Sequence, residues 1–577
     1  MREFLSQLVD RYRLSVARHD AVPQLALLGI VAGVLAGLTI VLFRMVVSLL
    51  QGLSPQGATE GLYESLAVEQ RLLLPIAGGL LIGVLFHFLS PGERRVGILH
   101  ILERLAWHQG HLPWRNTLVQ FIGGAISLSS GHSVGREAPG VHLGAASSNL
   151  PAQLLRLPNN SLRVTVACGA AAGIAASFNT PLAGVAFAME VLMLEYTVAG
   201  FAPVILAAVS ATVLSRWAFG SALAFGVPSV TPGGLVELPY IMAMGIGIGL
   251  LGSVFVLGVA RIGRYTRNIP VWVSFTGAGV VVGVCGMLVP QVMGVGDHTI
   301  TETLHGQYGV KLLLLIVLFK LLATLACIGS GLPGGMIGPS LVIGAAAGAL
   351  FALLGQWLGI TDPGTVPLYA LLGMGAMMAA ILQAPLAGLI AILELSGTPQ
   401  VIFPGMLAVV AATVSAGMCT QRESVFQALL RQRGVLYRDD PLTQSLRRIG
   451  VTAAMDRAVV VLLHRIVERE RAEKELESDP HWILIRESEQ PVLLLAAVDL
   501  ARALKHAPDQ QAFDLRELPA QRMETAGIDP QASLQEAHQQ ISATGAEALY
   551  VARSRSPGIL HVYGILTPQM IEQAYRY

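Results

Sequence analysis

Two segments built from glycine and proline contain the residues best suited to binding a solute. GHSVGREAPGVHLGAA begins at Gly131, and GLPGGMIGPSLVIGAA begins at Gly331. A proline among glycines at these places indicates that one helix ends and another begins. The first turn of a helix leaves backbone N–H groups free at the positive end of the helix dipole, so it attracts anions. Two such helix starts that converge would form an anion site without a buried lysine or arginine.

Glu137 is the only acidic residue within the two segments. An acid at this place in a membrane is costly unless it has a function. We expect its carboxylate to occupy the anion site and to leave it on protonation, which would make Glu137 a gate whose opening depends on pH. Two structural roles stay open: a carboxylate stabilised by the helix dipole, or an ion-pair partner of Arg136.

Several other residues that often carry chemistry are better explained by structural roles. His132 and His142 flank Glu137, but two histidines at this spacing make a poor metal site, so we expect no metal. The positions of Glu190 and Glu394 favour capping or packing at helix ends. The four cysteines form no CxxC pair, and we expect small buried side chains without disulfides.

The two broken segments belong to an internal duplication. Six residues of the first segment recur 200 residues later: Gly131, Gly135, Pro139, Gly144, Ala145 and Ala146 reappear as Gly331, Gly335, Pro339, Gly344, Ala345 and Ala346. PLAG at Pro181 recurs at Pro385, an offset of 204, and in both halves a glutamate follows nine residues after the proline. Halves with broken helices in matching positions indicate a transport site at their interface. The residues alone leave parallel and inverted halves open.

The composition places most of the chain in a membrane. Of 577 residues, 53% are hydrophobic and 13% are charged, whereas a soluble protein carries about 25% charge. Half of the Lys and Arg, 19 of 38, lie after residue 420, which indicates an apolar body followed by a soluble tail. Arg2, Arg11, Arg13 and Arg18 precede the first apolar run. The positive-inside rule therefore predicts cytoplasmic N- and C-termini, and an even number of crossings of a cytoplasmic (inner) membrane.

The charges and motifs also exclude several classes of protein. A net charge of +1 gives no basic field for nucleic acid. The apolar body has two lysines, Lys311 and Lys320, and a cation channel would instead show rings of acidic residues. No HExxH or GxxxxGK[ST] motif is present, so we expect neither an enzyme nor a cofactor. Two rival hypotheses are an intramembrane enzyme that uses Glu137 with a histidine, and a membrane-anchored regulator whose tail is the active part.

Three motifs resemble the CLC family of chloride channels and proton/chloride exchangers: GREAP at 135–139, AASFNTPLAG at 175–184 and GSGLPGGMIGP at 329–339. The similarity runs from about Val22 to Leu430. It implies an all-α polytopic membrane protein of two inverted repeats with broken helices, at about 22–218 and 237–430. It also implies a homodimer surrounded by membrane lipid, with one pathway for chloride or another small anion in each subunit.

The resemblance assigns roles to matching positions. Glu137 corresponds to the family's gating glutamate. The backbone amides of Met336 and Ile337 would face the central anion, and those around Arg136, Glu137 and Ala138 would lie near the outer site. These contacts use backbone groups or one carboxylate, which agrees with the argument from helix starts.

Three positions depart from the family pattern. Val96, followed by Gly97, stands where the family has a serine that contacts the ion, and Phe426 stands at the pore tyrosine. Val191 takes the place of the inner glutamate that relays protons in well-known exchangers. The loss of both hydroxyl donors weakens the expected discrimination among anions.

The missing inner glutamate decides the predicted mechanism. We predict passive or weakly coupled transport of chloride or a similar small anion, gated by Glu137. The alternative is a proton-coupled anion (H+/Cl−) antiporter, in which a water path or Glu195 replaces the missing side chain.

After Asp440 the sequence alternates helices with short apolar strands, as in a small α/β domain. This tail resembles a pair of CBS modules at roughly 450–510 and 520–577. The expected organisation is a cytoplasmic N-terminal helix at 1–21, a membrane domain at 22–430, a linker at 431–449 and a CBS-pair-like cytoplasmic domain at 450–577.

Nucleotide-binding CBS modules often hold the ribose with a Thr or Ser and an Asp three residues later. Here Thr567 is followed by Met570, and Asp499 is preceded by Ala496, so each module lacks half of the pair. A structural or dimer-stabilising tail is therefore favoured over a nucleotide sensor.

Overall fold

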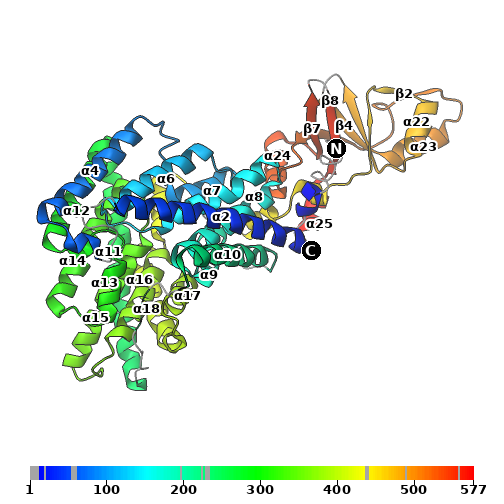
Figure 1. Ribbon diagram of the computed structural model, residues 1–577. Coiled ribbons are helices and arrows are strands. Elements are labelled where there is room, and N and C mark those ends of the chain that lie inside the picture. Colours follow the sequence, from blue (N-terminus) through cyan, green and yellow to red (C-terminus); the bar gives the residue numbers. More distant parts are fainter. Residues whose placement is uncertain are drawn as a thin grey trace. The chain divides into compact units, whose positions relative to one another are not determined.

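The computed structural model describes residues 12–17, 21–52, 61–194, 198–221, 225, 227, 234–435, 441–487, 490–556 and 559–576. These residues form two compact units. The membrane body comprises Ala26–Pro151 and Val164–Tyr437 and is helical (Figure 1). The tail unit comprises Met1–Leu25, Ala152–Arg163 and Arg438–Tyr577 and contains the strands. Of the predicted N-terminal helix at 1–21, residues 12–16 are described and helical.

The membrane body divides into two halves of similar helices. The first half contains α2 (Val22–Gly52), α3 (Leu62–Ser65), α4 (Val68–His87), α5 (Gly97–Trp107), α6 (Trp114–Ser129), α7 (Glu137–Leu154), α8 (Asn159–Phe178), α9 (Pro181–Phe187), the π-helix η1 (Ala188–Met193) and α10 (Val198–Phe219). The second half contains η2 (Leu235–Glu237), α11 (Leu238–Thr266), α12 (Val271–Leu288), η3 (Pro290–Val292), α13 (Asp297–Leu304), α14 (Val310–Ser330), α15 (Ile337–Trp357), α16 (Val366–Leu382), α17 (Pro385–Ser396), η4 (Pro399–Val401), α18 (Ile402–Thr420) and α19 (Val425–Gln432).

Glycines let matching helix pairs of the two halves approach closely. A Cβ on Gly144 of α7 would collide with the carbonyl of Gly169 on α8. A Cβ on Gly344 of α15 would collide in the same way with the carbonyl of Gly373 on α16. The second pair follows the first at the offsets of 200 and 204 that the motifs show. The duplication in the sequence is therefore also a duplication in packing.

Two glutamates tie the halves together by capping each other's helices. Glu190 accepts two N–H groups from the first turn of α17, at 3.2 and 2.7 Å. Glu394 accepts two N–H groups from the first turn of α9, at 2.9 and 2.7 Å. The carboxylates satisfy amides that a helix start leaves free. The predicted capping role of both residues is confirmed.

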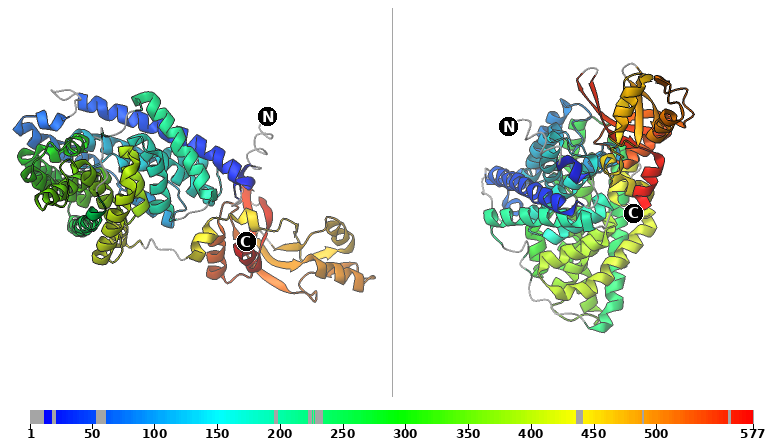
Figure 2. Two further views of the ribbon diagram at one scale, coloured as in Figure 1. Left: turned by 90° about the horizontal axis from the view of Figure 1, so that it is seen from below. Right: turned by 90° about the vertical axis from the view of Figure 1, so that its right-hand side faces the viewer.

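Helices of unequal length make up the membrane body (Figure 2). Nine helices of the described residues are long and apolar enough to cross a membrane. Three apolar stretches are shorter: Pro181–Met193, Val366–Leu382 and Pro385–Ser396. Such short pieces must be covered by protein at membrane depth, as predicted for the broken segments. The even number of crossings stays a prediction.

Three cysteines lie in the apolar interior, and one does not. Cys168, Cys285 and Cys327 are buried, and all four cysteines are free. Cys419 is exposed, so the expectation that all four are buried is wrong for this residue. It lies in the last turn of α18, next to Met418, which is also exposed.

The tail unit contains a six-stranded sheet in the order β1-β3-β4-β6-β7-β8 and a two-stranded sheet of β2 and β5. The strands are β1 (Val459–Leu462), β2 (Ile466–Glu468), β3 (Trp482–Glu487), β4 (Gln490–Ala496), β5 (Ala512–Asp514), β6 (Arg522–Ile528), β7 (Ala548–Ser556) and β8 (Ile559–Leu566). The helices are α20 (Pro441–Arg447), α21 (Val451–Ala454), α22 (Arg469–Leu476), α23 (Ala497–His506), α24 (Leu534–Thr544) and α25 (Pro568–Arg576).

The large sheet repeats one pattern twice. The parallel pair β1–β3 is followed by the antiparallel pair β3–β4, and the parallel pair β6–β7 is followed by the antiparallel pair β7–β8. A helix follows each antiparallel pair, α23 after β4 and α25 after β8. This arrangement is consistent with the predicted pair of CBS-like modules.

Candidate functional site

The two glycine–proline segments meet in the membrane body. The N–H of Gly135 donates to the carbonyl of Gly335, and the N–H of Gly335 donates to the carbonyl of Gly135, both at 2.8 Å. α7 begins at Glu137 and α15 begins at Ile337, two residues after this contact in each half. Two helix starts therefore converge at one place, as the repeat predicts.

Glu137 places its carboxylate at the point where the helix starts converge. The side chain is fully buried and accepts the N–H of Ile337 in a short hydrogen bond and that of Gly338 at 3.5 Å. A Cβ on either Gly135 or Gly335 would collide with this carboxylate. The two glycines thus make room for a negative group, which accepts N–H groups at the start of α15.

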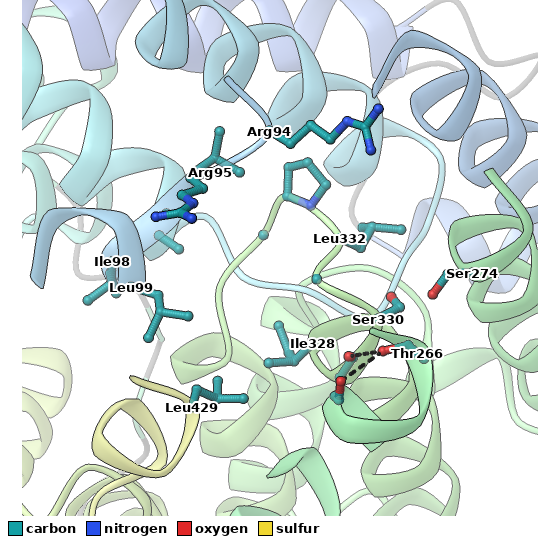
Figure 3. A pocket seen from close by; sticks show the side chains of 18 of the residues that line it. Arg94, Arg95, Ile98, Leu99, Thr266, Ser274, Ile328, Ser330, Leu332 and Leu429 are labelled. Carbon is teal, nitrogen blue, oxygen red and sulfur yellow. Dashed lines mark hydrogen bonds between the residues drawn. The ribbon is translucent and has the colours of Figure 1, made fainter. Parts of the chain in front are cut away.

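A cavity of about 450 Å³, here called the inner cavity, reaches this place (Figure 3). Its lining includes the predicted pore positions Val96, Gly97 and Phe426, together with Ala138 and Met336. Four arginines also line the cavity: Arg94, Arg95, Arg267 and Arg433. The described lining contains no acidic residue, and although Arg95 and Arg433 both pair with the buried Glu103, the arginines leave the cavity a positive potential that favours anions.

A second cavity of about 600 Å³, the outer cavity, is lined by Arg136 and Asp297. These two residues form an ion pair at 3.2 Å, and the guanidinium of Arg136 lies 4.8 Å from the ring centre of Phe178. Asp297, rather than Glu137, is therefore the ion-pair partner of Arg136.

Glu137 lies between the two cavities. Arg136 lines the outer cavity and Ala138 lines the inner cavity, while Glu137 lines neither. The side chain borders a small, largely apolar cavity of about 30 Å³ that also contacts Ile174 and Phe178. This position agrees with the predicted role of Glu137 as a gate, which stays a prediction.

A buried polar cluster beside Gly97 was not anticipated from the sequence. His142 Nδ1 accepts the N–H of Gly97 at 3.1 Å, and its Nε2 lies 3.4 Å from Nδ1 of His100. Gln120 is fully buried and lines the inner cavity. Its side-chain N–H₂ group has no hydrogen-bond partner among the residues that the structure describes. A buried donor without a partner is unfavourable, which makes Gln120 a candidate for contact with a ligand or water.

One sequence signal could have indicated Gln120. The offset of 200 pairs Gln120 on α6 with Lys320 on α14, and both side chains are fully buried. Lys320 donates to two backbone carbonyls at 3.0 and 2.8 Å, so its polar group is satisfied. The side-chain N–H₂ group of Gln120 lies beside Gly124 and has no such partner among the described residues.

The position of the missing inner glutamate does not border the inner cavity. Val191 is buried in the π-helix η1, directly after the capping residue Glu190. Glu195, the alternative proton relay, lies outside the described residues.

One hydrolase-like spacing was also missed. Residues 131–135 read GHSVG and match the GxSxG spacing of a nucleophilic serine. Ser133 is fully buried, and its hydroxyl lies 2.8 Å from that of Thr324 rather than beside a histidine. His132 Nδ1 lies 2.9 Å from the Ser130 hydroxyl instead.

Within the described parts of the chain, no three His, Cys, Asp or Glu side chains form a group that could hold a metal.

The candidate nucleotide residues of the tail unit have local partners. The hydroxyl of Thr567 accepts the N–H of Met570 at 3.4 Å at the start of α25. Asp499 accepts a hydrogen bond from Arg502 at 3.5 Å on α23. Both residues act at helix starts, which agrees with the preference for a structural tail.

Comparison with known proteins identifies the membrane body. Residues 78–417, more than half of the chain, match the family described as "Voltage gated chloride channel" (Voltage_CLC). The chain belongs to the CLC family. A ClcB-like chloride channel protein of Ralstonia nicotianae is 34% identical over 390 residues, which cover 65% of this chain and 90% of the relative. The H(+)/Cl(-) exchange transporter ClcA of Salmonella paratyphi B is 31% identical over 422 residues, 70% of this chain and 88% of the relative.

Solved structures show the same fold. A slow cyanobacterial Cl−/H+ antiporter superimposes with a TM-score of 0.64 at 24% identity, over 71% of this chain and 97% of its own. A eukaryotic CLC transporter covers 94% of this chain and 97% of its own, with a TM-score of 0.60 at 18% identity. This protein is therefore a multi-pass membrane protein with the CLC fold of two inverted repeats, and the CLC family transports anions.

Proposed function

We propose that this CLC protein exchanges chloride, or a similar small anion, for protons across a cytoplasmic membrane, as a homodimer with cytoplasmic termini. The observation that carries the proposal is the carboxylate of Glu137 on the amides of Ile337 and Gly338. An anion competes with the charged carboxylate for the same donors, whereas a protonated side chain leaves them free. Anion binding and proton binding are therefore linked at one residue, as exchange requires. The name of the Salmonella relative, an exchange transporter, supports the same choice.

Uncoupled anion flow is the second candidate, because Val191 supplies no proton acceptor. The inner cavity favours exchange nevertheless. It is lined by Ala138, next to Glu137, and by Met336, next to Ile337. Water in this cavity would bring protons close to Glu137 without an acid at Val191.

We assign the side-chain amide of Gln120 to anion binding in the inner cavity. Val96 and Phe426 line the same cavity and have no hydroxyl to offer an anion. Gln120 belongs to the same lining, and its N–H₂ group has no hydrogen-bond partner among the described residues, so a rotation of the amide would offer this donor to the cavity. A halide beside it would satisfy the buried donor and replace part of the missing hydroxyl contacts.

The test is simultaneous measurement of chloride and proton movement in vesicles that contain the purified protein. A chloride gradient should drive protons in the opposite direction at a fixed ratio. Glu137→Gln should keep anion flux and abolish proton movement, because glutamine cannot take up and release a proton. Glu69→Gln removes an exposed carboxylate on α4 and should leave both movements unchanged.

Two results would contradict exchange in different ways. Chloride flux in the unchanged protein without proton movement would assign uncoupled flow. Absence of any anion flux would favour the rival in which the tail is the active part.

A further inference from the structure

A basic pocket opens on the membrane body beside the anion pathway. It has a volume of about 470 Å³ and is lined by residues of α11, α18 and α19. Its lining includes Arg261 and Arg264 of α11 and Arg431 of α19. Glu423 is the only acid of the lining, and it pairs with Arg431 at 2.9 Å. We call this cavity, with Cys419 at its edge, the arginine pocket.

An apolar stripe on α11 leads into the arginine pocket. Leu250, Val254 and Leu257 are 48%, 55% and 54% exposed. Arg261 and Arg264 continue the same spacing of four and three residues, so all five lie on one helix face. α11 is one of the helices long enough to cross a membrane. In a membrane, acyl chains can therefore run along the stripe and end at the guanidinium groups.

The charges of the pocket suit one anionic group. Neither Arg261 nor Arg264 forms an ion pair with any residue that the structure describes. The C-terminal ends of α11 and α18 each contribute about half a negative charge, and with Glu423 they leave the three arginines a surplus of about one positive charge. That surplus matches the single charge of a phosphodiester, whose geometry suits the guanidinium group.

We propose that the arginine pocket binds the headgroup of an anionic phospholipid, with the acyl chains along α11. Basic pockets between membrane helices are suited to such headgroups. A zwitterionic lipid carries a cationic group that the arginines repel, so we expect it to bind more weakly. The position of the stripe favours a lipid over a free phosphate, because only a lipid uses both the stripe and the pocket.

α19 separates the arginine pocket from the anion pathway. Phe426 and Leu429 line the inner cavity, whereas Ala428 and Arg431 line the arginine pocket. Gln432 borders both, and its side chain donates to a carbonyl of α11 at 2.6 Å. A headgroup bound to Arg431 would therefore contact α19, the helix that positions Phe426. This effect on transport rests on the proposed function, whereas lipid binding does not.

Cys419 provides a direct readout of occupancy. It lines the pocket and is exposed, whereas the other three cysteines are buried. We expect phosphatidylglycerol, added to the full-length protein in detergent, to slow the labelling of Cys419 by a water-soluble maleimide. Phosphatidylcholine should not. The double variant Arg261→Gln/Arg264→Gln should need roughly 30-fold more phosphatidylglycerol for the same protection of Cys419.

Controls separate the lipid from other occupants. Lys311→Gln removes an exposed charge at the start of α14 and should keep full protection. Equal protection by phosphatidylcholine, or an unchanged response of the double variant, would overturn the proposal. Protection by inorganic phosphate or glycerol phosphate at the same concentration would assign a soluble anion instead. A dimer linked through Cys419 would assign the surface to a second copy of the chain.

Flux measurements test the link through α19. Chloride flux in vesicles with phosphatidylglycerol should differ from flux in phosphatidylcholine alone, and the double variant should show the same flux in both. If the lipid protects Cys419 but does not change the chloride flux, the headgroup site is supported and the proposed link through α19 is wrong. If lipid protects Cys419 and no vesicle shows flux, the proposed function fails and the lipid site stands.

Discussion

The donors around Glu137 can serve a carboxylate or an anion, but not both at once. The amides of Ile337 and Gly338 face the carboxylate, while Arg136 is paired with Asp297 on the outer side. No other fixed cation is needed, because the helix starts supply the positive end of the dipole. Under the proposed function, occupancy of the site by an anion would therefore depend on the charge of one side chain.

Gln120→Met tests the second donor of the pathway. Methionine has a similar length but no N–H group, so we expect chloride affinity to fall roughly tenfold. Calorimetric titration of the purified protein in the Glu137→Gln background measures this without competition from the carboxylate. Gln356→Met on α15 removes an amide away from both cavities and should leave affinity unchanged. An unchanged affinity in Gln120→Met would show that the anion does not use this donor.

A charged pair in the tail unit makes its stability depend on pH. Asp456 accepts hydrogen bonds from His481 Nδ1 at 2.7 Å and from Trp482 Nε1 at 3.1 Å. The hydrogen bond to Asp456 raises the pKa of His481 above its ordinary 6.5. Burial would raise the pKa of Asp456, but the N–H of Ala458 and the bond to His481 bring it below its ordinary 3.8.

The two pKa shifts predict that the stabilisation by this pair is lost both at high pH and at low pH. The contribution of His481 is complete below its ordinary pKa and is lost as pH rises through the raised value. The contribution of Asp456 is complete above its ordinary pKa and is lost on acidification. Amides at the start of β3 should therefore be better protected at about pH 6 than at about pH 8, after correction for intrinsic exchange. Hydrogen exchange of Asp456→Asn should show no such difference; if it does, another group is responsible.

At the scale of helices, the halves are joined by reciprocal caps. Glu190 and Glu394 each accept two first-turn amides of the opposite half, with nearly equal distances. We expect Glu190→Ala and Glu394→Ala each to lower stability by about 1–2 kcal/mol. The apparent melting temperature in detergent should fall by a similar amount in both, and less in the glutamine variants, which keep one acceptor. A loss of stability in only one of the two alanine variants would contradict equal roles of Glu190 and Glu394.

The repeat explains which contacts could be predicted. Convergence of the segments at Gly135 and Gly335, and capping by Glu190 and Glu394, follow from matching positions in the two halves. The pairing of Arg136 with Asp297 could not be predicted, because it joins positions that no repeat relates. Gln120 was missed for another reason: its repeat partner is a lysine, so the pair shares burial and polarity but not residue type.

At the scale of the whole chain, hydropathy and charge predict an apolar body and a polar tail, but not the boundary between compact units. The segment Ala152–Arg163 lies inside the predicted membrane domain and inside the residues that match the family, yet its contacts group it with the tail unit. The reason is hydrogen bonding: Asn159 donates to Glu536 at 3.0 Å, and Gln531 donates to the carbonyl of Leu157 at 3.0 Å. Composition carries no information about such pairs.

The segment Ala152–Arg163 contains the end of α7 and the start of α8. α7 starts at Glu137 and ends at Leu154, so its last three residues belong to this segment. We expect Asn159→Ala to speed hydrogen exchange in this segment and in α24, because it removes the hydrogen bond to Glu536. α15, the matching helix of the second half, should keep its protection and serves as the internal reference. Unchanged exchange in α24 would show that Asn159 does not hold the segment to the tail.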